Sequence, residues 1–378
     1  MQRLLKRLDQ KIRSWNHSRI DLMRAAQLFF FKVIFDSISR FVDKQNCGNR
    51  VLIFRLDDKI GDSITSTGFL REIKKNDPTL NLIVLAGEGT LFVYQNLPFV
   101  DEIKIVPKNF FGLLKTFWQL NKHSYKYIVN TSHILKPRVI FLASCLKAYK
   151  KISFLNPNYH LFSDHCLYSE NNDHVTKRYQ SALKIMEIDS SNLHYEVVIP
   201  RSNLSKAIEC TSSIKKINKK IIVLNSFAGA RLRNLNEETT VSLIQQTFIN
   251  NKNCVVVSIA HAGDMKILKI WQKKWSHPDW LIFENMTTLM DNTALMSQAD
   301  LIVTPDTSIV HLASALNKKL IAIFREDQGQ EKNSMIWAPI GDHAKVIYAE
   351  NLNSEHPDIN QVNIQKVVES INIALKED

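Results

Sequence analysis

One stretch of the chain, from Ala299 to Phe324, limits most strongly what the chain can fold into. It opens with a short apolar run, Leu301-Ile302-Val303, and passes through a turn into a segment whose apolar residues recur at helical spacing. It closes with a second apolar run, Leu320 to Phe324. A strand, a turn, a helix and a second strand in this order form the unit of a parallel sheet covered by helices. The stretch therefore predicts an α/β fold.

The turn inside this stretch carries residues that suit a phosphate group. Asp306 and Thr307 are good helix N-caps, and a helix N-terminus offers unpaired N–H groups and about half a positive charge. Thr307 and His311 are four residues apart, so they share one face of the helix. Taken alone, the residues are equally compatible with a capped helix that carries an ordinary histidine.

A second turn of this kind follows the apolar run Val51–Phe54. It reads Arg55-Leu56-Asp57-Asp58-Lys59-Ile60-Gly61-Asp62-Ser63 and leads into a helical pattern. Strand, glycine turn and helix in this order present a site at the carboxyl end of the strand. Neither a P-loop nor a G-x-G-x-x-G motif is present. Asp62, at the start of the helix, is either a simple cap or a functional carboxylate.

The two turns together resemble motifs of glycosyltransferase family 9, the lipopolysaccharide heptosyltransferases. Ile60-Gly61-Asp62 is similar to the family's first loop, and Asp306-Thr307-x-x-x-His311-Leu312-Ala313 is similar to its nucleotide-sugar motif. The motifs occur in the family's order, and the resemblance covers roughly residues 50–350. It implies the GT-B fold, in which two doubly wound parallel-sheet (Rossmann-like) domains face each other across a cleft.

The resemblance also implies roles for individual residues. Asp62 inherits the role of general base, and its neighbours in the acceptor-side loop are Lys59, Gly61 and Ser63. The residues assigned to the nucleotide-sugar donor are Arg231, Arg233, Asp264, Met286, Asp306, Thr307, Ser308 and His311. Arginine is well suited to the diphosphate, methionine to the adenine and aspartate to the ribose. Without the family, the two arginines read as solvated loop residues and the methionine as core filler.

The implied donor is a nucleoside-diphosphate sugar, ADP-heptose, bound as a substrate and without a cofactor. The implied acceptor is a Kdo-bearing lipid A or an inner-core oligosaccharide. Three positions depart from the family pattern, because Ser308 and Arg325 replace glycines and Leu235 replaces a tryptophan. These departures keep open a hexosyltransferase that uses another nucleotide sugar, and a descendant of the family that is no longer catalytic.

The polar residues of the chain argue against a metal centre. No Asp-x-Asp triplet is present to clamp a metal on a diphosphate. The five cysteines include no C-x-x-C pair, which predicts reduced thiols in the cytosol and neither a disulfide framework nor a zinc site. We therefore expect a metal-independent enzyme.

Positive charge is concentrated at the N-terminus. The net charge is +12, and the first fifty residues hold eleven Lys or Arg against four Asp or Glu, a local +7. A uniformly basic surface would indicate nucleic acid, whereas this asymmetry indicates an arm that faces an anionic surface. Two apolar helical faces lie in the arm: Leu4, Leu8, Ile12 and Trp15, and then Leu22, Ala26, Phe29, Phe30 and Val33.

Two interpretations of this arm are open. It docks on the cytoplasmic face of the inner membrane, where the lipid acceptor lies, or it packs on its own domain. Its apolar run Ala25–Phe35 is interrupted by Lys32 and is too short to span a bilayer.

The predicted domains are a basic helical arm over residues 1–49, an acceptor-binding domain over 50–180, a nucleotide-sugar-binding domain over 181–350 and a closing helix over 351–378.

Overall fold

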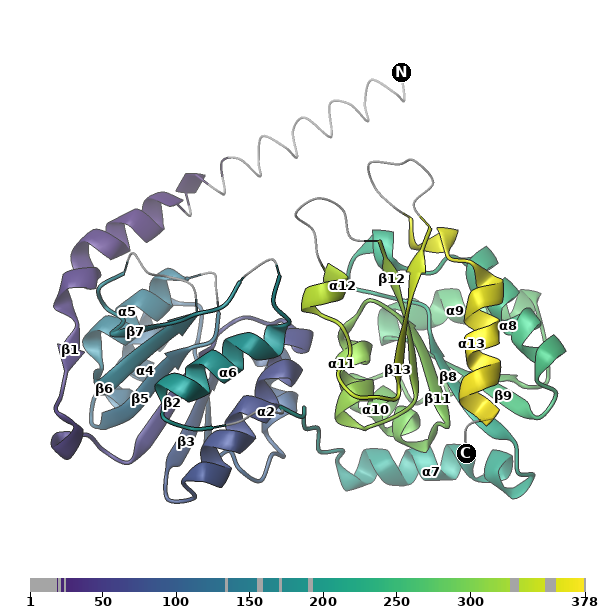
Figure 1. The fold of residues 1–378 in the computed structure, drawn as a ribbon, viewed down its shortest axis with the longest axis horizontal. Coiled ribbons are helices and arrows are strands. Elements are labelled where there is room, and N and C mark those ends of the chain that lie inside the picture. Colours follow the sequence, from purple (N-terminus) through teal and green to yellow (C-terminus); the bar gives the residue numbers. More distant parts are fainter. Residues whose placement is uncertain are drawn as a thin grey trace.

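The computed structural model describes residues 19, 22–23, 25–132, 135–154, 159–169, 172–189, 193–326, 333–350 and 358–376. These residues form two α/β domains that lie next to each other, each built on one twisted parallel sheet (Figure 1). In the described residues, no helix combines the length and the apolar character that crossing a membrane requires.

The N-terminal sheet has the strand order β1-β6-β5-β2-β3-β4, with β7 next to β6, and all its pairings are parallel. Its strands are β1 (Arg40–Phe41), β2 (Arg50–Arg55), β3 (Asn81–Ala86), β4 (Glu102–Ile105), β5 (Ser124–Asn130), β6 (Lys147–Phe154) and β7 (Asp164–Cys166). The central strand β2 is buried on both faces, which explains its continuous apolar run. From β2 the chain first adds strands on one side of the sheet (β3 and β4) and then on the other (β5 and β6), so the strand order reverses between β2 and β5. Open α/β sheets bind ligands at such a point.

The C-terminal sheet repeats this plan with the order β10-β9-β8-β11-β12-β13. Its strands are β8 (Lys220–Asn225), β9 (Cys254–Ile259), β10 (Trp280–Leu281), β11 (Leu301–Pro305), β12 (Leu320–Arg325) and β13 (Ala344–Ala349). Here the order reverses between β8 and β11. The predicted strand–turn–helix–strand unit is therefore confirmed as β11, a helix and β12.

Helices cover both faces of each sheet. In the N-terminal domain, one face carries α2 (Ile60–Asn76), α3 (Leu91–Tyr94) and α6 (Val175–Ile185), and the other carries α4 (Phe110–Leu120), α5 (Pro137–Cys145) and a helix over residues 25–35. In the C-terminal domain, one face carries α7 (Arg201–Lys216), α10 (Leu289–Gln298) and α11 (Ser308–Ala315), and the other carries α8 (Glu237–Asn250), α9 (Ala262–Lys274) and α13 (Ile364–Lys376). The short helix α12 (Asn333–Ile336) follows β12 in the chain.

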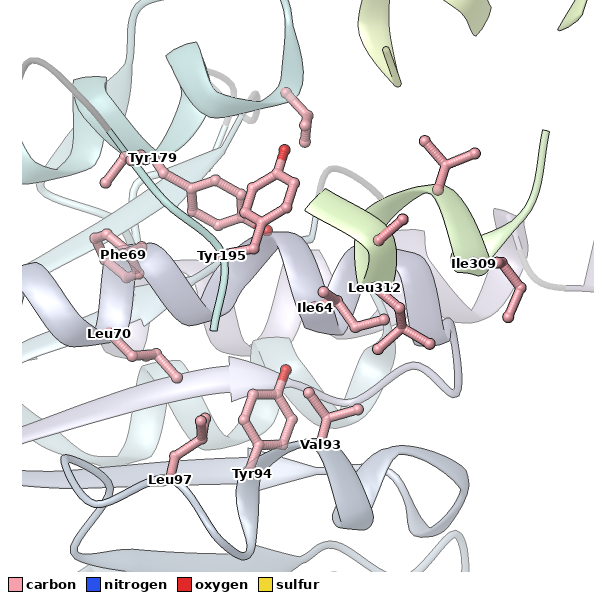
Figure 2. Packing of buried hydrophobic residues seen from close by; sticks show 14 of the residues in the cluster. Ile64, Phe69, Leu70, Val93, Tyr94, Leu97, Tyr179, Tyr195, Ile309 and Leu312 are labelled. Atoms are coloured by element: carbon pink, nitrogen blue, oxygen red, sulfur yellow. The ribbon is translucent and has the colours of Figure 1, made fainter. Parts of the chain in front are cut away.

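The two domains are joined through α2 and α11. Ile64 of α2 is fully buried and belongs to the same hydrophobic cluster as Ile309 and Leu312 of α11. Figure 2 shows these side chains packed together, with Tyr195 of the connecting segment beside them. One apolar core thus runs from the inner face of one sheet to the inner face of the other.

The predicted strand at Val51–Phe54 and the helix after it are confirmed as β2 and α2. The polar segment between β6 and α6 contains the short strand β7, and the 16-residue helix α7 precedes β8. Helix α6 packs on α2.

Part of the arm, the helix over residues 25–35, packs on its own domain, and docking on a membrane stays a prediction. Its Leu28, Phe31 and Phe35 pack on the N-terminal domain. On its other side, Phe29 and Phe30 are exposed. The apolar face of Leu4, Leu8, Ile12 and Trp15 lies outside the described residues.

Gly68 marks the tightest approach of α2 to the segment that connects the domains. A Cβ at this position would lie 2.5 Å from the carbonyl oxygen of His194. Glycine to alanine in an open helix stabilises it by up to about 1 kcal/mol. In Gly68→Ala we expect the opposite, a loss of about 1–3 kcal/mol of unfolding free energy, because the backbone must move. Thermal or urea unfolding measures the difference.

The matched control is Gly263→Ala in α9, where the nearest atom to the added Cβ is Nδ1 of His261 at an ordinary 3.6 Å. This variant should be at least as stable as the parent chain. Equal stabilities of the two variants would contradict the tight contact at Gly68.

Candidate active site between the domains

A cavity of about 700 Å³ opens between the two domains. One wall is the first turn of α2, and the other is formed by the carboxyl ends of β8, β9 and β11 with the helices that follow them. The lining residues are Lys59, Ile60, Gly61, Asp62, Asn225, Phe227, Ala228, Gly229, Arg233, Ala260, His261, Asp264, Leu289, Asn292, Asp306, Thr307, Ser308, Ile309, His311, Asn333 and Trp337. The points at which the strand order reverses in the two sheets thus face the same cavity. This is the position expected for a ligand held between two such domains.

The N-terminal wall presents a carboxylate held by a buried arginine. Asp62 lies in the first turn of α2, and its Oδ2 is 3.2 Å from Nη2 of Arg55, the last residue of β2. The same guanidinium lies 3.2 Å from Oδ1 of Asp57, and its Nη1 donates to the carbonyl of Thr131. Burial opposes the charge of Arg55, but the attraction of Asp62 and Asp57 outweighs it and the pKa of Arg55 is raised. Asp62 is therefore fixed in one orientation at the edge of the cavity.

A second cation completes the surroundings of Asp62. The Nζ of Lys59 lies 3.8 Å from Oδ2 of Asp62, but its side chain is mostly exposed. Such a pair contributes little to stability. Lys59 is instead placed to meet a negative group that enters the cavity.

The C-terminal wall presents a helix N-terminus beside an arginine. The side chain of Thr307 is the N-cap of α11 and accepts a hydrogen bond from the N–H of Ile309. Asp306, predicted as an alternative cap, instead pairs with Arg233, whose Nη1 lies 2.9 Å from its Oδ2. The arginine is about one third exposed and lines the cavity. An N-terminus and a guanidinium side by side suit a diphosphate.

His311 lies between the two walls as a neutral group. Its imidazole is buried, and burial lowers its pKa to about 4. It packs edge-on against Tyr195 and Trp337, and its Nδ1 has no hydrogen-bond partner among the described residues. A Cβ on Gly61 would lie 3.1 Å from Cδ2 of His311, so the first turns of α2 and α11 meet closely here. Only glycine fits this approach without a shift.

The far end of the cavity carries polar groups from α9 and α10. Asp264 lies in the first turn of α9, whose N-cap is His261. Asn292 of α10 donates through Nδ2 to the carbonyl of Ala260, while its buried Oδ1 has no partner among the described residues. An acceptor fixed in this way suits a hydrogen-bond donor on a bound nucleoside.

Most of the predicted site residues line the cavity, and three do not appear in its lining. Those that line the cavity are Lys59, Gly61, Asp62, Arg233, Asp264, Asp306, Thr307, Ser308 and His311. Ser63 is fully buried and its hydroxyl donates to the carbonyl of Lys59, so it supports the turn from behind. Met286 is buried in the core and is absent from the lining. Arg231 begins the short helix η4 (Arg231–Arg233), and its side chain lies outside the described part of the chain.

Sequence reasoning missed two residues. The sequence shows Arg55 as a charged residue at the end of an apolar strand, but the neighbouring residues do not indicate which side chains it pairs with. Asn292 sits in an unremarkable helical pattern. As for a metal, the described residues contain no group of three or more His, Cys, Asp or Glu side chains placed to bind one.

The sequence matches the model of a known protein family. The model of glycosyltransferase family 9 (heptosyltransferase) matches residues 113–367, a region that contains the donor-side residues but not Asp62. A search of curated proteins finds no match.

Three solved structures illustrate the likeness of the fold. A family 9 glycosyl transferase from Veillonella parvula has 17% identity and a TM-score of 0.74, with 90% of this chain and 100% of that chain covered. The E. coli ADP-heptose LPS heptosyltransferase II has 18% identity and a TM-score of 0.69, with 87% and 99% covered. The E. coli heptosyltransferase WaaC with ADP has 13% identity and a TM-score of 0.65, with 86% and 99% covered. The predicted GT-B architecture is confirmed.

The lowered pKa of His311 predicts how the stability of the folded protein changes at acidic pH. In the unfolded chain His311 has its ordinary pKa of 6.5, whereas in the folded chain its pKa is about 4. The unfolded state therefore binds more protons between these two pH values, and the free energy of unfolding decreases as the pH falls through this range. The loss attributable to this one group is roughly 3 kcal/mol. We expect His311→Gln to flatten the pH dependence of urea unfolding between these two pH values. The exposed His343, changed to Gln, is the control and should leave the dependence as it is. An unchanged slope in His311→Gln would exclude the buried neutral imidazole.

Proposed function

The chain belongs to glycosyltransferase family 9, the heptosyltransferases, and we propose that it is an inverting, metal-independent enzyme that transfers heptose from ADP-heptose. The proposed acceptor is Kdo-bearing lipid A or the inner core of a lipopolysaccharide or lipooligosaccharide. One observation carries the proposal. A carboxylate held by a buried arginine lines one wall of the cavity, and a helix N-terminus with an arginine lines the other.

The proposed reaction is a single displacement. A hydroxyl of the acceptor attacks the anomeric carbon of the donor sugar while Asp62 takes its proton, and the bond from that carbon to the diphosphate breaks. A positioned base contributes about 10²–10⁴-fold to the rate. Arg55 orients the carboxylate without touching the reactants. Attack from the side opposite the leaving group inverts the configuration of the anomeric centre.

The departing ADP gains negative charge as the bond breaks, and this charge needs partners. Arg233, the hydroxyl of Thr307 and the first N–H groups of α11 supply them in this proposal. The salt bridge between Arg233 and Asp306 keeps the guanidinium at the mouth of the cavity before the donor arrives. The uncharged His311 adds a hydrogen-bonding group next to Asp62 without adding a competing cation.

We place the enzyme at the cytoplasmic face of the inner membrane, as a peripheral protein. The proposed acceptor is an anionic lipid, and the basic N-terminal arm suits its surface. The exposed Phe29, Phe30 and Val33 of the helix over residues 25–35 support this placement.

The second candidate is transfer of another sugar, such as a hexose from a UDP-linked donor, within the same architecture. Ser308 favours it, because this residue lines the cavity at the start of α11 and adds a Cβ where the family has glycine. The ion pair between Arg55 and Asp62 argues against a descendant without activity. Burying two charges has a desolvation penalty, and an inactive protein would gain nothing from retaining the pair.

The first test is turnover with a defined donor. Purified enzyme is offered ADP-heptose or UDP-hexoses with a Kdo-bearing lipid A acceptor, and the products are identified by mass spectrometry. We expect heptose transfer, and we expect Asp62→Asn to reduce turnover by about 10² or more while the donor still binds. Asp58→Asn, which changes an exposed carboxylate outside the lining, serves as the control. Near-normal turnover in Asp62→Asn would remove the proposed base, and transfer of hexose alone would favour the second candidate.

The second test concerns the diphosphate. Calorimetry should show that Arg233→Ala weakens the binding of ADP by roughly tenfold or more, since a charge-assisted hydrogen bond is lost, while adenosine binding changes little. Lys269→Ala, on the outer side of α9, is the control. The rate should be unchanged by a chelator. A rate that EDTA abolishes and magnesium restores would contradict the metal-independent mechanism.

A further inference from the structure

Three helices cover the outer face of the N-terminal sheet, and α5 is the middle one. Phe141 of α5 contacts Phe117 of α4, with ring centroids 5.5 Å apart. It also contacts Phe35, at the end of the helix over residues 25–35, with centroids 5.4 Å apart. The three helices therefore pack on the same face of one sheet.

The outer side of α4 is aromatic. Phe111 is 81% exposed, and Phe110 and Trp118 are each 66% exposed. The inner side is also apolar, since Leu113 and Phe117 pack on the core. A surface helix of a soluble protein normally exposes polar residues on the side away from the core. The outer aromatic side of α4 therefore calls for a partner.

Lysines alternate with the aromatic residues on this side. Phe111, Lys115 and Trp118 follow one another at helical spacing along α4, Lys122 lies in the turn just after the helix, and all four are exposed. The sequence of α4, FFGLLKTFWQL, contains no acidic residue. We call these four residues the α4 stripe.

The helix over residues 25–35 exposes apolar residues on the same outer face. Phe29 is 70% exposed, and Phe30 and Val33 are comparable. Adjacent packed helices lie about 8–10 Å apart, so two helices with α5 between them lie roughly 20 Å apart. The face thus carries two separate apolar contacts.

We propose that the α4 stripe is a second membrane-docking element, which inserts Phe111 and Trp118 into the interface of an anionic bilayer. Lys115 and Lys122 then lie against the lipid phosphates. Aromatic side chains favour the headgroup level of a membrane, and lysines next to an anionic leaflet add electrostatic attraction. The inference rests on the membrane placement in the proposed function and extends it from the arm to the body of the domain.

Charge favours lipid over a second copy of the chain as the partner of the stripe. A two-fold symmetric contact would bring the lysines of both stripes into one interface with no acidic residue of α4 to balance them, and like charges in an interface are destabilising. An anionic lipid surface complements them instead.

Two contacts at separate points also orient the enzyme. The loop before α4 follows β4 at the carboxyl edge of the sheet, and its Lys108 reaches Asp58 of the loop after β2, with Nζ 3.5 Å from Oδ2. The stripe therefore begins beside the loop that leads to Asp62. A bilayer on this face would hold a lipid-linked acceptor near the N-terminal wall of the cavity.

The test uses the full-length chain and vesicles of phosphatidylethanolamine and phosphatidylglycerol. We expect the vesicle partition coefficient of the double variant Phe111→Ala/Trp118→Ala to fall by about tenfold or more, because two large apolar side chains no longer enter the bilayer interface. The matched control is Ile249→Ala/Ile270→Ala, two comparably exposed residues of α8 and α9 in the C-terminal domain. The control should bind vesicles like the parent chain, and both double variants should keep its melting temperature.

Trp118 offers a direct readout of insertion. Lipids brominated near the headgroup should quench part of the tryptophan fluorescence of the parent chain, and Trp118→Phe should lose that part. Sedimentation in the absence of lipid shows whether the stripe instead joins two copies.

The outcomes separate the two levels of the proposal. If the parent chain and the α4 double variant float equally well with vesicles, the proposal that the α4 stripe docks on the membrane is overturned, while docking by the arm stands. If the parent chain does not bind vesicles, both fail. A variant that loses dimerisation and keeps vesicle binding also overturns the stripe. Heptose transfer to a soluble acceptor is measured in parallel, so a failure of the proposed chemistry is seen separately from a failure of docking.

Discussion

The site depends on the contact between the first turns of α2 and α11. The apolar side chains Ile64 and Leu312 hold the two helices together, and Gly61 lets their ends approach. Without this contact, Asp62 and Arg233 would belong to two unrelated surfaces. Because both helices begin at the cavity, both present the positive end of their dipoles to it. The resulting field suits an anionic donor before any side-chain charge is counted.

Buried polar groups balance this field. Arg55 ties Asp62 in place, and a buried ion pair of this kind is weak evidence for stability. Burial lowers the pKa of His311 and keeps it neutral, so the Lys and Arg side chains among the described lining residues are Lys59 and Arg233. Each has a carboxylate nearby, Asp62 and Asp306 respectively. The described part of the cavity thus holds charges that can exchange partners when a diphosphate enters.

The N-terminal domain has two working faces. Its inner face joins the other domain and supplies Asp62, while its outer face carries α4, α5 and the helix over residues 25–35. The same sheet separates the two faces, and the loops at its carboxyl edge connect them, as the contact between Lys108 and Asp58 illustrates. In the proposed function, the cavity and the proposed docking surface therefore belong to one domain, which would suit a lipid-linked acceptor.

The sequence by itself determined the features that depend on local pattern. The strand β2, the cap Thr307 and the α/β alternation follow from apolar runs, turn chemistry and helical spacing, and the motifs around Asp62 and Asp306 pointed to GT-B. Only the tertiary structure decided which side chains meet. Met286 lies in the core rather than at the cavity, and Arg233 pairs with an aspartate 73 positions away. The inner and outer sides of α4 are both apolar in the sequence, and only packing on the sheet shows which aromatic residues remain exposed. Contacts between distant segments depend on how sheets and helices pack, and no local pattern encodes that arrangement.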